Sequence, residues 1–600
     1  SADTRWETML DIDALSRAEG RDWVWKGADC LAPDETRCLV SLSDGGKDAV
    51  VVREFDTSNG RWVEDGFILP EGKHRLEWLD RDTLLVATDF GTENGAATLT
   101  ESGYPFIVKS LRRGQTLAQA TEVYRGDIGD GGYGVSPSVY RDKDGAVQAV
   151  IISRPLDTYR SETWELVDGS PVKLEIPERV SIYGVINDSL VFSNDEPWTH
   201  MTREIPAGSL LSPCLPCIRR QTGDDMVISN RSYGIFFPEE RQSIADVRVL
   251  DDRVLVAISD NVVGRLAVFE DRGEWGWRRT DISTPDNLSV DLGDSSKSSE
   301  RVFITTQGFL TPSTLSLADT RAGTTETLRT APARFDASTH VVEQFEATSS
   351  DGTKIPYFVT RPRDLVMDGH APTIIYGYGG FQVSKPPAYI PEMGRLWLEN
   401  GGVYVNANIR GGGEFGPQWH QSVLNENRQL AFDDFAAVAA DLHRRGITSP
   451  RRTGIYGRSN GGVLTSVTMT QHPELIHAAV IESPLIDMLR YHELPAGASW
   501  IGEYGDPRIP EEAAWIARYS AYQNLRPGAD YPRVYITTNT RDDRVHPGHA
   551  RKFAARLTDM GYDHLYFEET SGGHSNDADP VANARRWARH YVYLSQQLMD

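Results

Sequence analysis

The chain has 600 residues, 39% hydrophobic and 25% charged, a composition typical of a globular protein with sizeable cores. Lysine and arginine number 62 against 86 aspartate and glutamate residues, so the formal net charge of −24 would repel a nucleic-acid backbone. No run approaches the roughly 18 to 20 apolar residues of a membrane span, and the first ten residues do not resemble a secretion signal. We expect a cytoplasmic protein without nucleic-acid or membrane partners; the periplasm and secretion stay open if the N-terminus is incomplete.

The four cysteines fall into two close pairs, Cys30 with Cys38 and Cys214 with Cys217. Four cysteines in a chain of this length cannot form a disulfide scaffold. No second cysteine pair or histidine pair stands at metal-ligand spacing near Cys214. We therefore expect four ordinary thiols, no metal and no cofactor.

The first 335 residues show the pattern of an all-β domain. Short apolar runs alternate with Gly, Asn and Asp turn signals, and no long helical period appears. Because more than 300 residues exceed one sandwich, and a propeller blade takes about 40 to 50 residues, we predict a seven-bladed β-propeller at 1–335. The strand-like runs are Ala49–Phe55, Thr83–Thr88, Val147–Ser153, Leu190–Ser193 and Val254–Ser259.

Residues 336–600 alternate strand-like runs with helical stretches, which indicates a mainly parallel sheet with helices on both faces. We predict an α/β domain here, with an apolar core face on the helix Phe432–Arg444. The predicted strands are Thr373–Tyr376, Val403–Asn408, Gly454–Tyr456, Ala478–Ile481, Val534–Thr538 and Leu565–Phe567, and the other predicted helices are Gly461–Thr470, Gly548–Met560 and Val581–Leu598.

A candidate nucleophile stands in the segment Gly457–Gly462, which reads GRSNGG, between a predicted strand and a predicted helix. A serine at such a sharp turn is held in a strained conformation that exposes its oxygen, and flanking glycines avoid collisions with strand and helix. The G-x-S-x-G pattern alone is weak in a chain with 53 glycines. Its place between strand and helix makes Ser459 the predicted nucleophile.

A serine nucleophile needs a histidine base, and the histidine needs a carboxylate partner. In this architecture the acid and the base follow the serine in that order. Asp542 and Asp543 follow one predicted strand, and His574 follows the next, after two glycines that allow close approach. We predict His574 as the base. The residues alone leave either aspartate open as the acid.

The tetrahedral intermediate needs hydrogen-bond donors aimed at its oxyanion. One donor is expected to be the backbone N–H of Asn460, which follows the nucleophile. The second is expected from the glycine-rich loop Tyr376–Phe381, where a tyrosine hydroxyl can donate.

These segments together resemble the prolyl oligopeptidase family of serine peptidases. The family's motifs appear in its order as GYGGF at 377–381, NIRGGGEFGPQWH at 408–420, GRSNGG at 457–462, DDRVHP at 542–547 and GGH ending at His574. The resemblance covers about residues 340–600 closely and the front half more loosely. It implies an α/β-hydrolase domain capped by a seven-bladed propeller that admits short, unstructured peptides.

Carried over by position, the resemblance makes Ser459 the nucleophile, Asp542 the acid and His574 the base. It also makes Tyr378 the side-chain oxyanion donor and Arg544 a binder of a substrate carbonyl. Arg458, where the family commonly has glycine, and the Ser-Asn pair after His574 depart from its pattern and bear on substrate fit.

The resemblance further implies a pocket for the residue that precedes the scissile bond. Trp500 matches the tryptophan that stacks on a substrate proline, and Phe381, Tyr504 and Val545 match its other apolar positions. A flat aromatic wall suits a rigid pyrrolidine ring. Glu482 stands where the related oligopeptidase B group places acids that bind Arg or Lys, so cleavage after a basic residue stays an alternative.

The family normally begins with a helical segment and the first propeller strands, and about a hundred residues of that kind are absent here. The stretch Trp6–Leu15 resembles part of a first blade. Either the chain is a truncated or processed form, or an N-terminal fragment is supplied separately as a partner beside short peptides; monomer and dimer both stay open.

We predict a cofactor-independent serine oligopeptidase that cleaves after proline. The alternatives are a basic-specific oligopeptidase, an acylaminoacyl-peptidase-like exopeptidase and, outside enzymes, a propeller binding module with an inactive hydrolase domain.

Overall fold

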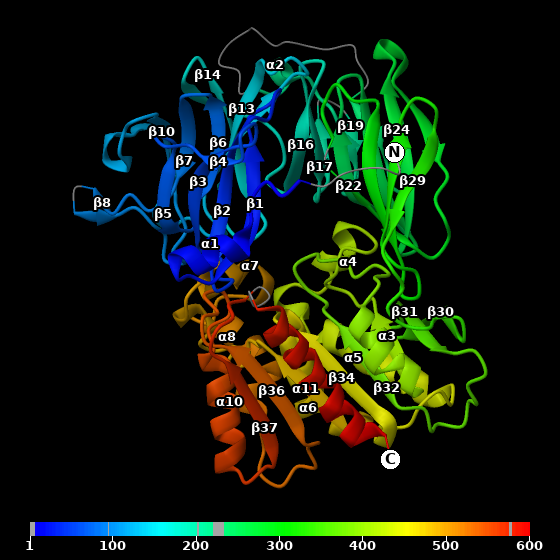
Figure 1. Ribbon diagram of the computed structural model, residues 1–600. Coiled ribbons are helices and arrows are strands. Elements are labelled where there is room, and N and C mark those ends of the chain that lie inside the picture. The colour runs from blue at the N-terminus through cyan, green and yellow to red at the C-terminus, as the bar shows by residue number, and fades with distance from the viewer. Residues whose placement is uncertain are drawn as a thin grey trace.

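The computed structural model describes residues 7–93, 95–200, 203–219, 233–293, 295–574 and 579–599. A strand-rich front half lies above a mixed helix and strand half, as the blue-to-green and yellow-to-red parts of Figure 1 show. The chain therefore folds as a β-propeller domain followed by an α/β-hydrolase domain, which confirms the predicted fold class.

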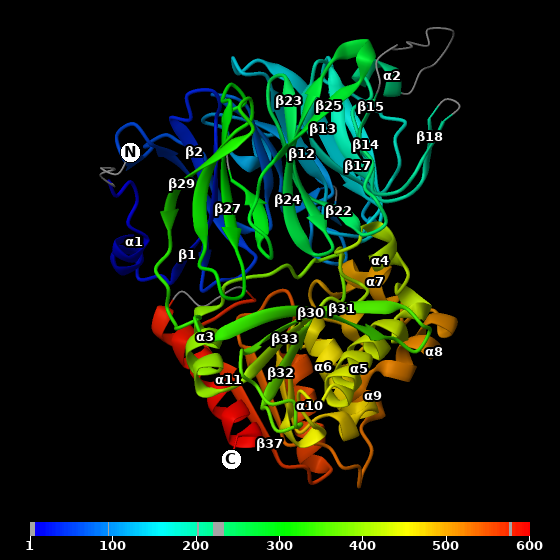
Figure 2. The same cartoon turned by 90° about the vertical axis from the view of Figure 1, so that its right-hand side faces the viewer.

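The propeller consists of antiparallel sheets that follow one another along the chain, and Figure 2 turns the last of them, in green, toward the viewer. In the described residues six such sheets are present, whereas we expected seven. They run from β1 (Trp23–Cys30) to β5 (Ile68–Gly72), β6 (Arg75–Asp80) to β11 (Thr121–Arg125), β12 (Ser136–Arg141) to β15 (Ser170–Lys173), β16 (Val180–Ile186) to β21 (Gly234–Phe236), β22 (Gln242–Val249) to β25 (Trp277–Ile282) and β26 (Ser289–Leu292) to β29 (Thr324–Thr330).

Two of these sheets are accompanied by inserted hairpins. Two hairpins form separate two-stranded sheets. They are β8 (Thr92–Glu93) with β9 (Ala96–Ala97), and β18 (Trp198–His200) with β19 (Arg203–Ile205). Each insertion lengthens its blade without adding another.

The stretch Trp6–Leu15 was expected to be part of a first blade, and this was wrong for its described part. Helix α1 (Ile12–Glu19) begins there, because the Asp11 carboxylate accepts a hydrogen bond from the Ala14 N–H at 2.8 Å. Leu10, Ile12 and Leu15 pack against the core of the first sheet. The first strand begins only at Trp23.

The hydrolase domain is built on one eight-stranded sheet in the order β30-β31-β33-β32-β34-β35-β36-β37. The first two strands are antiparallel neighbours, and the strands from β33 onward in that order pair in parallel. Their bounds are β30 (His340–Thr348), β31 (Lys354–Pro362), β32 (Thr373–Gly377), β33 (Val403–Ala407), β34 (Thr453–Arg458), β35 (Ala478–Glu482), β36 (Val534–Asn539) and β37 (His564–Glu569).

Helices cover both faces of this sheet. Helices α5 (Gln429–Arg444), α6 (Asn460–Gln471) and α10 (Gly548–Asp559) contribute to one hydrophobic core, and α3 (Pro391–Leu396) and α11 (Pro580–Leu598) contribute to the core on the other face. Phe435, Val438, Ala439 and Leu442 of α5 are all buried, in accordance with the predicted core face. The shorter helices are α2 (Leu215–Ile218), α4 (Pro417–Gln421), α7 (Ile501–Tyr504), α8 (Pro510–Tyr519) and α9 (Ala521–Asn524).

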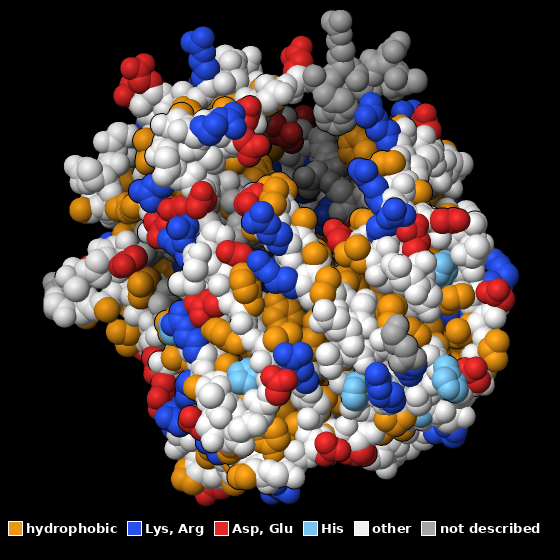
Figure 3. Space-filling model, turned by 60° about the horizontal axis from the view of Figure 1, so that its bottom comes forward, with side chains coloured by type: hydrophobic (Ala, Val, Ile, Leu, Met, Phe, Trp, Pro, Cys, Tyr) orange, Lys and Arg blue, Asp and Glu red, His pale blue; other side chains and the backbone are white. Residues whose placement is uncertain are grey.

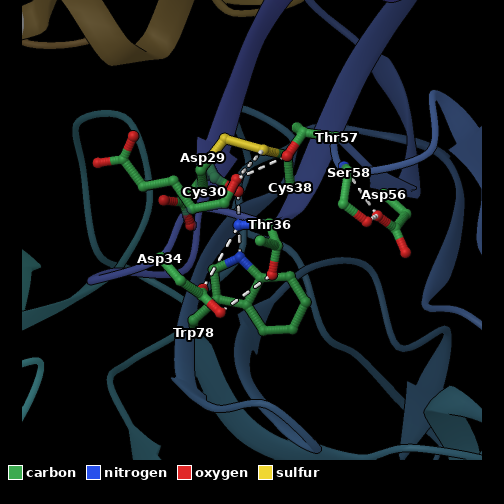
Figure 4. Close-up of a disulfide and its surroundings, with 10 residues drawn as sticks. Asp29, Cys30, Asp34, Thr36, Cys38, Asp56, Thr57, Ser58 and Trp78 are labelled. Carbon is green, nitrogen blue, oxygen red and sulfur yellow. Dashed lines mark hydrogen bonds between the residues drawn. A yellow bond between two sulfur atoms is a disulfide. The ribbon is translucent and has the colours of Figure 1, made fainter.

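The expectation of four free thiols was wrong, because the structure pairs all four cysteines. Cys30 of β1 and Cys38 of β2 (Arg37–Asp44) stand directly opposite each other in the antiparallel register, and Figure 4 shows their disulfide beside Trp78. Cys214 and Cys217 lie on one turn at the start of α2. Strand register brought the first pair together, and register cannot be read from cysteine spacing.

Among the described residues, no group of three or more His, Cys, Asp or Glu side chains is placed to hold a metal ion. Within the same residues, no helix is both long and apolar enough to cross a bilayer. On the face shown in Figure 3, acidic and basic side chains lie interspersed with apolar ones.

Candidate active site

Ser459 occupies a sharp turn between β34 and α6. Its backbone has φ 60° and ψ −119°, a conformation that a non-glycine residue rarely adopts. A Cβ on Gly457 would stand 2.1 Å from the Gly461 oxygen, and one on Gly462 would stand 2.6 Å from the Pro484 Cβ. The flanking glycines are therefore required by close packing around the half-buried serine, as the motif predicts.

Asp542 and His574 meet in a buried hydrogen bond. The imidazole Nδ1 lies 2.7 Å from Asp542 Oδ2, and the side chains are 0% and 8% exposed. The other carboxylate oxygen accepts hydrogen bonds from the N–H groups of Arg544 and Val545 at 3.1 and 2.8 Å. Asp542 thus holds its own loop and the imidazole at the same time.

Asp543 points toward a different partner. Its carboxylate accepts the backbone N–H groups of Asp48 and Ala49 in the propeller, at 2.8 and 3.2 Å. The structure therefore separates two adjacent aspartates that the residue pattern left equivalent: Asp542 contacts the histidine, and Asp543 joins the two domains.

Three consecutive carbonyl groups fasten the loop that carries His574. The Arg541 N–H donates to the Gly572 oxygen at 3.3 Å, and the Asn539 amide donates to the Gly573 oxygen at 2.6 Å. The guanidinium of Arg458 donates to the carbonyl of His574 itself. The unusual residue before the nucleophile therefore links the nucleophile strand to the base. The Ser-Asn pair after His574 lies outside the described residues.

Tyr378 lies beside the nucleophile, and its hydroxyl interacts with the Ser459 side chain. Burial raises the pKa of Tyr378 above its ordinary value, so the hydroxyl stays protonated and able to donate. Asn460 is the first residue of α6, where backbone N–H groups have no intrahelical acceptor. Its side chain donates to the Tyr378 carbonyl at 2.5 Å and accepts from the Tyr504 hydroxyl at 2.6 Å.

An aromatic wall lies beside these groups. The Phe381 and Tyr504 rings meet edge to face at 5.8 Å, and Tyr491 stacks on Trp500 and contacts Tyr504 at its edge. Trp500, Tyr504 and Val545 are buried in one hydrophobic cluster against which Phe381 packs. The four apolar residues predicted for the pocket therefore all belong to or pack against one hydrophobic core, and Phe381 and Tyr504 are in direct contact.

Glu482 does not belong to this wall. Its carboxylate accepts hydrogen bonds from the Tyr456 hydroxyl at 2.7 Å and from Arg586 of α11, and it lies 3.6 Å from Arg458. Burial alone would raise the pKa of Glu482, but Arg458 and Arg586 outweigh it and hold the pKa well below its usual range. The expectation that places Glu482 in the specificity pocket is corrected here, because its charge is already neutralised on the α11 side of the sheet.

Sequence reasoning missed a buried ion pair under the site. Glu503, between Trp500 and Tyr504 in sequence, accepts hydrogen bonds from Arg428 at 2.5 Å, from the Phe381 N–H at 3.1 Å and from His420 at 2.8 Å. Arg428 also donates to the Asn460 side chain at 2.8 Å. No motif marks Arg428, whereas a glutamate inside a buried aromatic segment was an available signal for Glu503.

Propeller residues reach the site from above. Asp48 accepts two hydrogen bonds from the guanidinium of Arg544, both at 2.7 Å. The Thr158 hydroxyl donates to the Ser499 carbonyl at 2.6 Å, and Tyr159 bonds to Glu503. The surroundings of the candidate site are therefore shared between the two domains (Figure 1).

Comparison with known proteins gives consistent matches over the whole chain. Residues 393–600 match the prolyl oligopeptidase family, and residues 1–166 match the prolyl oligopeptidase N-terminal beta-propeller domain. The uncharacterized peptidase y4nA of Sinorhizobium fredii is 42% identical over 605 residues, which span 100% of this chain and 82% of that protein. A prolyl endopeptidase of Elizabethkingia miricola is 37% identical over 262 residues, 44% of this chain and 37% of that protein.

Among solved structures, a post-proline cleaving enzyme from Rickettsia typhi superimposes with a TM-score of 0.92 at 32% identity, over 99% of this chain and 86% of that one. These matches cover both halves of the molecule in the order in which the structure has them. The chain belongs to the prolyl oligopeptidase family and is a serine peptidase.

Proposed function

We propose that this peptidase hydrolyses short peptides on the carboxyl side of proline, with Ser459 as nucleophile, His574 as base and Asp542 as the acid that orients it. The observation that carries the proposal is the buried Asp542–His574 hydrogen bond beside a serine in a strained strand-to-helix turn. Serine becomes an effective nucleophile only when such a pair removes its proton.

In the proposed reaction the imidazole Nδ1–H donates to Asp542, which leaves Nε2 free to take the proton of Ser459. The serine oxygen attacks the peptide carbonyl, and the Tyr378 hydroxyl and the Asn460 N–H stabilise the resulting oxyanion. His574 then protonates the leaving amine, and later it activates the water that hydrolyses the acyl-enzyme.

The aromatic wall supports proline as the residue before the scissile bond. A pyrrolidine ring buries apolar area against Trp500 and loses little conformational freedom on binding. An arginine there would bring a charge into an apolar pocket, and the candidate acid Glu482 is paired with Arg586 elsewhere. The Rickettsia typhi structure, at 32% identity, carries the name of a post-proline cleaving enzyme, which also favours proline.

The test is kcat/KM on two matched fluorogenic peptides that have proline or arginine before the scissile bond, with Ser459→Ala as the blank. We expect a preference for proline of at least about 100-fold, since an unpaired buried guanidinium costs several kcal/mol. Equal rates, or a preference for arginine, would overturn the proline assignment and leave the serine-peptidase assignment intact.

Arg544 is proposed to bind a carbonyl of the substrate while Asp48 holds its guanidinium in place. Asp48→Asn should raise KM about 3- to 10-fold with little change in kcat, because the guanidinium loses the partner that orients it before substrate binds. Michaelis–Menten kinetics on the proline peptide measure this.

Asp22→Asn is the matched control, since Asp22 contacts Arg541 at 3.5 Å on the same domain boundary but not Arg544. An equal rise of KM in both variants would show a general loosening of the two domains and contradict the specific role of Asp48.

A further inference from the structure

A cavity of about 440 Å³ lies on the α11 side of the catalytic sheet, below the last propeller blade. In Figure 2, β27 (Arg301–Gln307) ends above α3 and α11, and residues of β27 and α11 line the cavity. Its volume falls within the range of about 300 to 1,000 Å³ that is usual for small-molecule sites. None of the triad residues or aromatic-wall residues lines it, so it is a separate space. Its aromatic lining residues are Phe309, Tyr376, Tyr404, Tyr456, Trp587 and Tyr591.

Two polar side chains that line the cavity have buried atoms without a hydrogen bond among the described residues. They are Arg458, at its Nε–H, and His590, at both ring nitrogens. His590 is 2% exposed, and burial lowers its pKa to about 4, so the ring is neutral at pH 7 and keeps one N–H donor. The nearest acceptor in the described chain is the Glu482 carboxylate, 3.6 Å from Arg458 Nε and 3.9 Å from His590 Nε2, which is too far for a hydrogen bond. Because buried polar groups are nearly always hydrogen-bonded, both side chains can still donate to a bound ligand.

The charges around the cavity favour an anion. Lys385 and Arg458 line it. The Lys385 ammonium lies 4.2 Å from the Tyr378 ring centre, and its electrostatic partner is the buried Glu414, with which no close ion pair forms in the described part of the chain. The lining carboxylate is Asp291, whose pKa burial raises. Glu482, next to Arg458, is already bonded to Arg586 and Tyr456.

We propose that this cavity binds a small aromatic carboxylate, with its ring against the aromatic walls and its carboxylate accepting hydrogen bonds from Arg458 and His590. A carboxylate offers acceptors only, as the unpaired donors demand, and charge-assisted bonds to a guanidinium are among the stronger ones. The ring would bury apolar area against tyrosine and tryptophan faces.

Occupation of the cavity acts on the catalytic histidine through Arg458. This guanidinium donates to the His574 carbonyl, and a bound carboxylate competes for it. The loop that holds the base is then fastened less tightly, while the substrate pocket is untouched. The ligand therefore lowers kcat and leaves KM unchanged. This regulatory effect rests on the proposed triad, whereas binding to the cavity does not.

Binding is tested by calorimetry with 2-naphthylacetate on the full chain carrying Ser459→Ala. We expect saturable 1:1 binding, with the neutral isostere 2-naphthylacetamide weaker by about tenfold because it cannot form charge-assisted bonds. Absence of saturable binding would mean that water alone fills the cavity and would overturn the proposal. Equal affinity for 2-naphthylacetate and 2-naphthylacetamide would also overturn it.

The location is tested with Ala388→Phe, which fills the cavity from its lining loop, against Ala331→Phe, an exposed alanine that does not line it. The first should abolish binding and the second should leave it unchanged. If Ala388→Phe fails to fold, Lys385→Gln should still weaken binding several-fold. On the unsubstituted enzyme, loss of binding after an organophosphonate has labelled Ser459 would place the ligand in the active site and overturn the proposal.

The coupling is tested on the unsubstituted enzyme with the proline peptide. Saturating 2-naphthylacetate should lower kcat about tenfold at constant KM. A rise of KM alone would indicate competition at the substrate pocket and would overturn the proposed coupling. Unchanged kinetics would overturn the coupling as well. An enzyme without turnover would refute the proposed function, while the calorimetric result would still decide the binding site.

Discussion

Ser459→Ala should lower kcat by about 10⁵- to 10⁶-fold while peptide affinity changes little. The covalent route needs the serine oxygen, and the oxyanion donors and the aromatic wall cannot replace it. Ser459 is also the residue that adopts φ 60°, and alanine can occupy this turn with the packing of Gly457 and Gly462 unchanged.

The measurement is steady-state turnover of the proline peptide, with calorimetric binding of the same peptide and stoichiometric labelling by an organophosphonate. Ser466→Ala is the matched control. Ser466 is a buried serine of α6, the helix that begins directly after Ser459, and in the described chain its hydroxyl donates only to a carbonyl of that helix. Appreciable cleavage by Ser459→Ala, or loss of labelling in Ser466→Ala alone, would contradict the assignment.

Asp542→Asn should lower kcat by about 10⁴-fold, the size of effect expected when the acid of a catalytic triad becomes an amide. An asparagine amide can donate to the imidazole Nδ1, which favours the wrong tautomer and removes the charge that stabilises the imidazolium. Asp543→Asn should lower kcat by less than about tenfold. The Asp543 carboxylate accepts hydrogen bonds from backbone N–H groups of the propeller and does not contact His574.

Both variants are compared by kcat on the proline peptide and by their thermal unfolding midpoints, so that a loss of chemistry is separated from a loss of stability. The two substitutions change the same residue type at adjacent positions, which makes each a control for the other. A larger loss in Asp543→Asn at an unchanged unfolding midpoint would reassign the acid.

Features that depend on local chain conformation were predictable from the sequence. The turn at Ser459 needs glycines at fixed positions and a strand and a helix on either side, all within a few residues. Alternation of apolar runs identified the parallel strands to within a few residues of their ends, since buried strands require continuous apolar segments. The propeller was recognised for the same reason.

The disulfide between Cys30 and Cys38 depends on the register of β1 against β2, which is set by contacts between strands. The residue pattern could not distinguish Asp542 from Asp543, because the two differ only in which side of a loop faces the histidine.

The sequence by itself determined the fold class, the strand-to-helix turn at Ser459 and the order of Asp542 and His574 along the chain, because periodicity, glycine spacing and chain order are properties of the linear chain. Only the tertiary structure decided that Glu482 faces Arg586, that Glu503 is paired with Arg428, and that Asp48 reaches Arg544. Each of these pairs joins residues separated by 75 or more positions. Such contacts depend on how sheet, helices and propeller pack in space, and the energy of a buried charge depends on the partner that packing provides.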